Sequence, residues 1–223
     1  MGCKCNNINS EKKTEMIPEI ISSRTIQNNN NNDEIEDEEK EKMEKYSDYP
    51  MKIFNLINKI RQNPKDFADV IEDSIQNIIT EENSQEDNKP KIIYKQKVKV
   101  ALTRGEPAFK EIAKELRNMT PVPPLEFKEE ICIPLPDNEN DFRDPNYLRN
   151  KVKDILSKNI PINAFYKDLV KIPNVAVLLM ILDDNRKNAG KKRKALLNKN
   201  FKYIGISYRF IGKTFISYYS FSK

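Results

Sequence analysis

The sequence predicts an α+β domain in which helices surround a small antiparallel sheet with a carboxy-terminal hairpin. Two observations lead to this prediction. Apolar residues recur at helical spacing in several segments between residues 48 and 182, whereas residues 201–223 are rich in aromatic and β-branched side chains. Because helices precede a carboxy-terminal pair of strands, we expect an α+β layer architecture for residues 48–223.

The first two helices are predicted on either side of a proline. The apolar residues of the first follow the i, i+3, i+4, i+7 pattern of one buried stripe: Ile53, Leu56, Ile57 and Ile60. This helix should end at Asn63, because the residue before a proline is pushed out of the helical region. Pro64 suits the first turn of the second helix. Residues 80–90 are predicted to be a polar loop, and residues 92–100 to be extended or irregular.

The third helix is expected to begin at the Gly105-Glu106-Pro107 segment and to run through Leu116. The proline-rich residues 121–125 should stop it. Residues 133–145 are rich in proline and asparagine and are predicted to be a loop.

Two more helices are predicted at residues 147–156 and 175–182. The second is almost entirely apolar and too short to span a bilayer, so we expect a central core helix. The segments 201–208 and 214–221 are predicted to be strands, and the short connection containing Gly212 fits a hairpin.

Residues 1–47 are predicted to be a disordered, acidic, Asn-rich tail, because they cannot bury enough apolar surface to offset their chain entropy. They carry 7 Lys and Arg against 11 Asp and Glu, a net charge of −4, which leaves 32 and 23 for the remainder, or +9. A basic body favours anionic partners: a membrane surface, an acidic protein, or the acidic tail itself. Nucleic acid is not expected, since arginines are few and aromatic residues do not alternate with basic ones.

The cysteines Cys3, Cys5 and Cys132 are too few and too unevenly placed for a disulfide framework. The start of the chain lacks the hydrophobic segment of a secretory signal, and no apolar run approaches transmembrane length. We therefore expect an intracellular protein that is not secreted.

The amino terminus has the arrangement used for dual acylation. Removal of Met1 would expose Gly2 for a myristoyl chain, and a palmitoyl thioester on Cys3 or Cys5 would add the second anchor that stable attachment needs. Position six is Asn6, where Ser or Thr is usual. The alternative is an unmodified polar tail with exposed thiols. With acylation, the expected location is the cytoplasmic face of a membrane.

The chain contains no histidine, and this absence excludes much chemistry. There is no neutral imidazole base, no Ser-His or Cys-His nucleophile pair and no imidazole ligand for a metal. Cys132 is expected to be a small buried hydrophobe, since no base accompanies it. The prediction is a protein without catalytic residues, metal or cofactor.

Three segments together resemble the CAP superfamily, also called SCP-like: the cysteine-rich secretory, antigen-5 and plant pathogenesis-related proteins. Residues 56–68 are similar to its opening N-x-x-R-x-x-P helix, and Gly105-Glu106-Pro107 followed by residues 123–125 is similar to its next segment. Residues 182–206 resemble its most specific signature, with Asp183-Asp184 and the stretch from Arg193 to Ile206. The resemblance covers about residues 48–223 and implies an α-β-α sandwich. It includes an intracellular, myristoylated branch that binds anionic lipid.

The departures from the family pattern concern its central cleft, where relatives place two histidines and two acidic side chains that sometimes hold a metal. Here the second histidine falls on Lys192, and the region of the first, residues 131–149, offers four acidic residues in its place: Asp137, Glu139, Asp141 and Asp144. Lys192 would repel a divalent cation, so the metal site is not transferable. Asp183 and Asp184 are expected to bond nearby backbone rather than to form a catalytic pair.

A basic run is the remaining candidate for binding: Arg186, Lys187, Lys191, Lys192, Arg193 and Lys194. It could face anionic lipid headgroups or the acidic surface of a protein partner, and the alternative is a solvated loop. The sequence therefore predicts a non-enzymatic CAP-like protein tethered to a membrane. The rival prediction is a scaffold module for a cytoskeletal or membrane-associated complex, and an enzyme that uses carboxylates and Lys192 is a more distant alternative.

Overall fold

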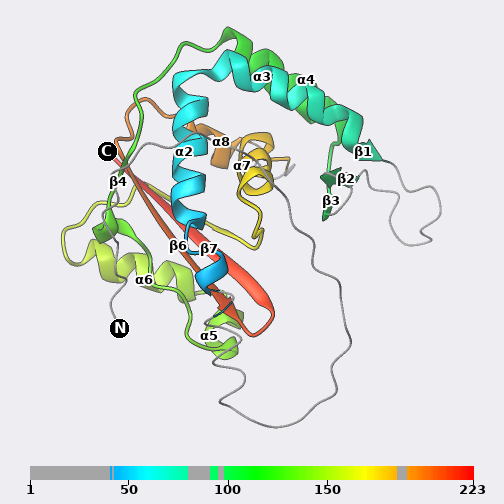
Figure 1. Ribbon diagram of the computed structural model, residues 1–223. Coiled ribbons are helices and arrows are strands. Elements are labelled where there is room, and N and C mark those ends of the chain that lie inside the picture. The colour runs from blue at the N-terminus through cyan, green and yellow to red at the C-terminus, as the bar shows by residue number, and fades with distance from the viewer. Residues whose placement is uncertain (1–40, 42, 80–90, 95–97, 185–189) are drawn as a thin grey trace, which may run out of the picture. The chain divides into compact units, whose positions relative to one another are not determined.

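The computed structural model describes residues 41, 43–79, 91–94, 98–184 and 190–223 (Figure 1). All of them belong to one compact unit, residues 33–223. The α-helices are α2 (Tyr49–Gln62), α3 (Pro64–Asp73), α4 (Glu106–Asn118), α5 (Glu139–Arg143), α6 (Tyr147–Leu156), α7 (Pro173–Leu182) and α8 (Lys191–Leu196). The strands are β1 (Ile78–Ile79), β2 (Lys91–Tyr94), β3 (Val98–Ala101), β4 (Glu126–Phe127), β5 (Ala164–Asp168), β6 (Tyr203–Ile211) and β7 (Thr214–Ser222).

The predicted helices are confirmed, and prolines mark where several of them begin. A proline occupies the first or second position of α2, α3, α4 and α7, where the missing backbone N–H would have no partner within the helix. Helix α6 has the predicted bounds. Helix α7 buries seven of its ten residues, as expected of a core helix. None of the helices in the described part of the chain is long and apolar enough to cross a membrane.

The main sheet has the strand order β4-β6-β7-β5. The predicted hairpin is confirmed: β6 and β7 are antiparallel from Tyr203↔Ser222 to Ile211↔Thr214, and Gly212 turns the chain with a φ of +57°. The expectation of a purely antiparallel sheet is wrong, because β4 runs parallel to β6. A second, antiparallel sheet has the order β1-β2-β3, so part of the segment 92–100 is extended.

Several short elements were not expected, and three of them are α5, β5 and α8. Helix α5 lies inside the predicted loop 133–145, and the side chain of Asn138 caps it by accepting a hydrogen bond from Asp141 N. Strand β5 pairs antiparallel with β7, from Ala164↔Phe221 to Asp168↔Ser217. Helix α8 occupies a segment predicted to be a loop, and its first turn follows Gly190, whose φ is +84°.

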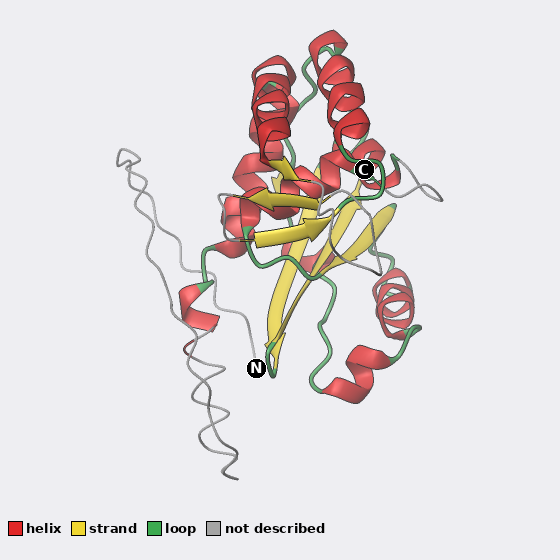
Figure 2. Cartoon of the chain, turned by 90° about the vertical axis from the view of Figure 1, so that its right-hand side faces the viewer, coloured by secondary structure: helices red, strands yellow, loops and turns green. Residues whose placement is uncertain are grey.

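Helices cover both faces of the main sheet, which confirms the α+β class (Figure 2). Alternate residues of β7 divide between two apolar clusters, because successive side chains of a strand point to opposite faces. Phe215, Tyr219 and Phe221 join the large cluster formed with α2, α3, α4, α7 and α8. Ile216 and Tyr218 join a smaller cluster with Val152 and Ile155 of α6 and the neighbouring segments.

The described chain reaches the domain core before residue 48. Met43 and Tyr46, which lie in the segment predicted to be a tail, pack partly buried against the large cluster. The hydroxyl of Tyr208 donates to the backbone oxygen of Met43 at 3.1 Å. The Tyr46 ring lies 5.4 Å from that of Phe210, measured between centroids. The first residues of the described chain are therefore held to the β6–β7 hairpin.

A buried arginine joins three distant segments. Arg61, in the last turn of α2, has no exposed surface. Its guanidinium donates to four backbone oxygens: those of Pro123 (2.7 Å), Leu196 (2.6 Å), Asn198 (3.1 Å) and Phe201 (3.1 Å). Burial lowers the pKa of Arg61 to about 10, so the group stays charged at neutral pH.

Asn58, one turn before Arg61 in α2, also binds the backbone of the segment before β4. Its side-chain amide donates to Leu125 O at 2.9 Å, and its oxygen accepts from Leu125 N at 2.7 Å. Leu125 directly precedes β4, so this pair of bonds delivers the segment to its parallel pairing with β6. The N-x-x-R pattern of the sequence is thus a pair of backbone clamps.

Gly205 permits a close approach of β6 to the backbone of residues 131 and 132. A Cβ atom at this position would lie 2.8 Å from Cys132 N, 2.8 Å from the carbonyl carbon of Ile131 and 2.7 Å from Ser220 Oγ. Contacts of that length do not occur in folded proteins, so a larger residue would force the backbone apart.

We expect Arg61→Met to destabilise the domain by about 3–5 kcal/mol, because four backbone carbonyl groups, two of them in buried residues, would lose their donor. The measurement is the free energy of unfolding in urea. Arg143→Met is the control, since Arg143 forms an exposed i, i+4 pair with Glu139, and its effect should stay within about 0.5 kcal/mol. A loss below about 1 kcal/mol in Arg61→Met would contradict the clamp.

Candidate functional site

The structure places only part of the predicted site. Gly2, Cys3 and Cys5, the expected lipidation residues, lie outside the described residues, as do Arg186 and Lys187. The remaining four members of the basic run form most of α8: Lys191, Lys192, Arg193 and Lys194. They do not share one surface.

Arg193 points into the domain, contrary to the expectation that it faces a ligand. It is 8% exposed, and its guanidinium lies 3.3 Å from Glu111 Oε1 and 3.4 Å from Glu115 Oε2 of α4. Arg104 also binds Glu111, and its hydrogen bond is the main cause that lowers the pKa of this carboxyl. Arg193 therefore fastens α8 to α4.

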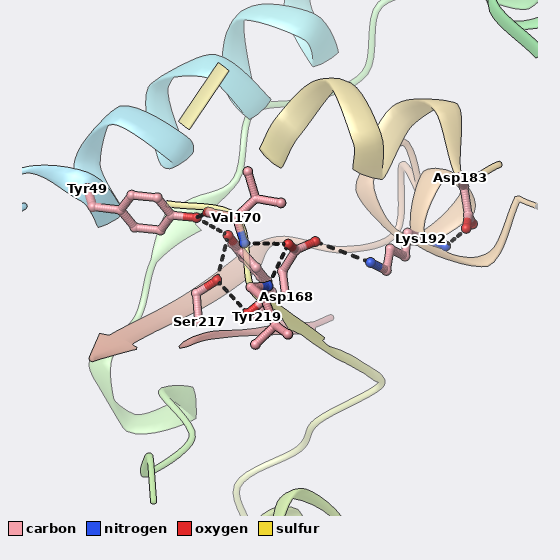
Figure 3. A network of polar contacts seen from close by, with 8 residues as sticks. Tyr49, Asp168, Val170, Asp183, Lys192, Ser217 and Tyr219 are labelled. Atoms are coloured by element: carbon pink, nitrogen blue, oxygen red, sulfur yellow. Dashed lines mark hydrogen bonds and ion pairs between the residues drawn. The ribbon is translucent and has the colours of Figure 1, made fainter. Parts of the chain in front are cut away.

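Lys192 also turns toward the domain, where it meets a buried carboxylate (Figure 3). Its Nζ atom lies 3.3 Å from Oδ2 of Asp168, whose side chain is 8% exposed. The other carboxylate oxygen accepts backbone hydrogen bonds from Leu169 at 2.8 Å and Val170 at 3.0 Å. Lys192 thus connects α8 to the end of β5.

Asp183 and Asp184 bind backbone amides, which confirms the prediction for this pair. Asp183 follows α7 in the left-handed conformation, and its Oδ2 accepts from Lys192 N at 2.6 Å. Asp184 accepts from Thr103 N at 2.7 Å and from Arg104 N at 2.8 Å. The two carboxylates hold α8 and the start of α4 close to the end of α7.

A chain of hydroxyl groups lies behind Asp168 (Figure 3). Ser217 donates to the Tyr219 hydroxyl at 3.1 Å, and the hydroxyls of Tyr219 and Tyr49 are 2.7 Å apart. Tyr49 donates to Val170 O at 2.9 Å, which leaves Tyr219 as the donor to Tyr49. Burial raises the pKa of Tyr49 to about 12 and that of Tyr219 well above its ordinary value.

Sequence reasoning missed this network almost entirely. Asp168 belongs to a five-residue strand with a weak pattern, and the register of β5 on β7 is what brings it opposite Ser217. Tyr219 follows from the alternation of β7, but its partner Tyr49 lies 170 positions earlier in the chain. No local signal relates the two.

An open hollow of about 390 Å³ lies between β5 and α8. The exposed lysines of the run, Lys191 and Lys194, stand in its wall. The Tyr166 hydroxyl donates to Lys191 O at 2.8 Å, and burial raises the pKa of Tyr166 to about 12. The lining residues are Ala164, Phe165, Tyr166, Lys191, Lys194, Ala195, Asn198 and Phe201. The combination of two lysines with apolar lining residues suits an anionic ligand that also has apolar parts.

The described residues contain no group of three Cys, Asp or Glu side chains placed to hold a metal ion. Cys132 is half-buried, and its sulfur lies 3.7 Å from the backbone oxygens of Lys128 and Ile206. The chain matches no protein-family model, no curated protein and no solved structure. Its function must therefore be inferred from the chemistry of its own residues.

The Asp168–Lys192 pair should couple more strongly than a surface ion pair, because the carboxylate is buried. We expect a double-mutant cycle of Asp168→Asn and Lys192→Met to give a coupling free energy of about 1–2 kcal/mol in urea unfolding. The matched cycle on the exposed pair Glu106–Lys110, 48% and 66% exposed, should give about 0.3–0.5 kcal/mol. Equal coupling free energies in the two cycles would show that the Asp168–Lys192 pair is no stronger than an exposed ion pair.

Ionisation of buried tyrosines should destabilise the domain at high pH. A tyrosine in the unfolded chain releases its proton near pH 10, whereas Tyr49 has a pKa of about 12 in the folded domain. This contribution to stability is complete below pH 10 and is lost as the pH rises toward 12. Tyr219→Phe should reduce the decline by about 1.4 kcal/mol per pH unit in this window, measured as the free energy of unfolding. Equal slopes for variant and parent would contradict the buried network.

Proposed function

We propose that this chain is a non-enzymatic CAP/SCP-like protein, lipid-anchored to the cytoplasmic face of a membrane, that binds anionic lipid through α8. The observation that carries the proposal is the division of the basic run. Lys192 and Arg193 hold the helix in place, and Lys191 and Lys194 are exposed beside an open hollow. A helix fixed in this way presents two cations at defined positions to an anionic surface.

The residues that carry the CAP resemblance also hold the domain together, which supports that part of the proposal. Asn58 and Arg61 of the first motif clamp the backbone around β4 and after α8. Of the last motif, Arg193 binds α4 and Gly205 allows the close approach of residues 131 and 132. Helices on both faces of the sheet are compatible with an α-β-α sandwich.

The contacts of Lys192 support a function without catalysis. This residue stands where the family signature has a histidine, and it forms an ion pair with Asp168. An ion pair needs the protonated amine, whereas a lysine that attacks a carbonyl group must be neutral. Both carboxylate oxygens of Asp168 are engaged as well, one by Lys192 and the other by two backbone amides.

The lipid anchor rests on the sequence at Gly2, Cys3 and Cys5. Two acyl chains would give residence on the membrane, and the lysines of α8, joined by Arg186 and Lys187, would sense the headgroups. The second candidate is a scaffold module that docks a protein partner. One specific observation favours it: the main sheet ends in β5, and residues of this edge strand line the hollow described above.

The unacylated full chain should co-sediment with vesicles that contain about one-third anionic lipid, and the binding should weaken with salt. Lys191→Gln with Lys194→Gln should weaken it by about 30-fold, because each lysine near such a surface is worth about 1 kcal/mol. The matched control is Lys153→Gln with Lys158→Gln, which removes two exposed lysines from the region of α6.

Binding that is independent of anionic lipid and of salt would contradict the role of α8. The anchor is tested separately, by intact-mass analysis of the native protein and by Gly2→Ala in cells. The native protein should carry acyl chains, and Gly2→Ala should leave the membrane fraction. Retention of this variant on the membrane would contradict myristoylation.

A further inference from the structure

Strand β5 forms one edge of the main sheet. In the order β4-β6-β7-β5, its five residues pair with β7 on one side, and the other side faces no strand of the described chain. The backbone groups on a free edge are a template for one more strand. Proteins recognise extended peptides in this way, with main-chain hydrogen bonds for affinity and side-chain pockets for specificity.

The hollow beside α8 is lined in part by this edge strand. It is lined by three consecutive residues of β5: Ala164, Phe165 and Tyr166. The hollow therefore lies against β5, which is an edge strand of the main sheet. Its opposite wall comes from α8 and the following turn, through Ala195, Asn198 and Phe201.

This opposite wall is held firmly. The backbone oxygen of Lys191 accepts from the Tyr166 hydroxyl at 2.8 Å. Lys192 binds Asp168 through its side chain at 3.3 Å and Asp183 through its amide at 2.6 Å. The distance between α8 and β5 is therefore fixed before a ligand binds, which lowers the entropic cost of binding.

The charge of the groove is positive. Lys191 and Lys194 are three residues apart, so they lie on the same side of α8, and both are exposed. Neither forms an ion pair within the described part of the chain. The lining includes no acidic residue. Carboxylates are the complementary groups, and the apolar lining by Ala164, Ala195 and Phe201 suits intervening apolar side chains.

We propose that β5 and α8 bind an extended acidic peptide of a partner protein, which adds to the main sheet as a strand beside β5. Carboxylates at every second position would meet Lys191 and Lys194. A lipid headgroup could neutralise the lysines but could not pair with the backbone of β5. A second copy of the chain is disfavoured, because pairing of two β5 edges would bring the lysines of both copies together. This inference does not rest on lipid binding.

The test uses the full chain and a fluorescently labelled peptide of alternating Glu and Val, six residues long, in a polarisation assay. Lys191→Gln with Lys194→Gln should weaken binding by about tenfold, and Lys153→Gln with Lys158→Gln should leave it unchanged. A peptide of alternating Lys and Val should not bind. Binding that does not respond to the α8 variant would overturn the proposal.

Two methylated forms of the peptide distinguish strand addition from simple attraction of charges. One carries N-methyl groups on every Glu and the other on every Val. Only alternate amides of an added strand face β5, so one form should lose binding by about tenfold or more and the other should keep it. Equal affinities for the two forms would overturn strand addition.

Two other occupants would also overturn the proposal. If the peptide binds only after Asp33, Glu34, Glu36 and Asp37 are changed to amides, the occupant of the groove is this acidic segment of the chain itself. If sedimentation shows a dimer that the peptide dissociates, the groove belongs to a second copy. Failure of vesicle binding alone contradicts the lipid role and leaves the peptide assay unaffected, because no lipid is present in it.

Discussion

The position of α8, and with it the groove beside β5, depends on one buried cation. Arg61 has no carboxylate within ion-pair distance in the described part of the chain, and its charge is balanced by the dipoles of four carbonyl groups. These carbonyls belong to the segment before β4 and to the end and following turn of α8. One side chain therefore sets the entry of β4, the exit of α8 and the approach to β6. Taking a charge out of water is costly, and the four carbonyl groups offset this cost by replacing the lost contacts with water.

Elements with strong local signals could be predicted, and those that depend on distant partners could not. Helices α2, α3, α4, α6 and α7 follow from apolar periodicity and from prolines, and the β6–β7 hairpin follows from its aromatic strands. Strand β5 was missed because five residues that include Lys167 and Asp168 acquire their conformation from β7. Helix α8 was missed because a run of cations is a poor helix signal. Its conformation depends on Arg61 and on carboxylates of α4 that lie about 80 positions earlier.

Composition predicts the basic run as one site, but the structure turns its side chains in different directions. The sequence predicts one basic run, but a helix turns by about 100° per residue, so neighbours in the sequence face different ways. Lys192 turns toward the buried carboxylate of Asp168 and Arg193 toward exposed carboxylates of α4, whereas Lys191 and Lys194 line the hollow. The pair of Tyr49 and Tyr219 could not be predicted, because its contacts join α2 to β7 and to Val170 across more than 100 positions. The place of Asp168 depends on the pairing of β5 with β7.

The different directions of the α8 side chains separate binding specificity from folding stability, two properties that usually constrain each other. Binding surfaces on small domains often share residues with the core, so a change of specificity also changes stability. Here the two side chains that fasten the helix, Lys192 and Arg193, stand between two lysines that form no ion pair in the described part of the chain. The outer pair, Lys191 and Lys194, can be replaced by neutral, acidic or aromatic residues while Lys192, Arg193 and Arg61 keep the helix in place. The groove is therefore suited to evolution or engineering of new specificities at little cost to folding.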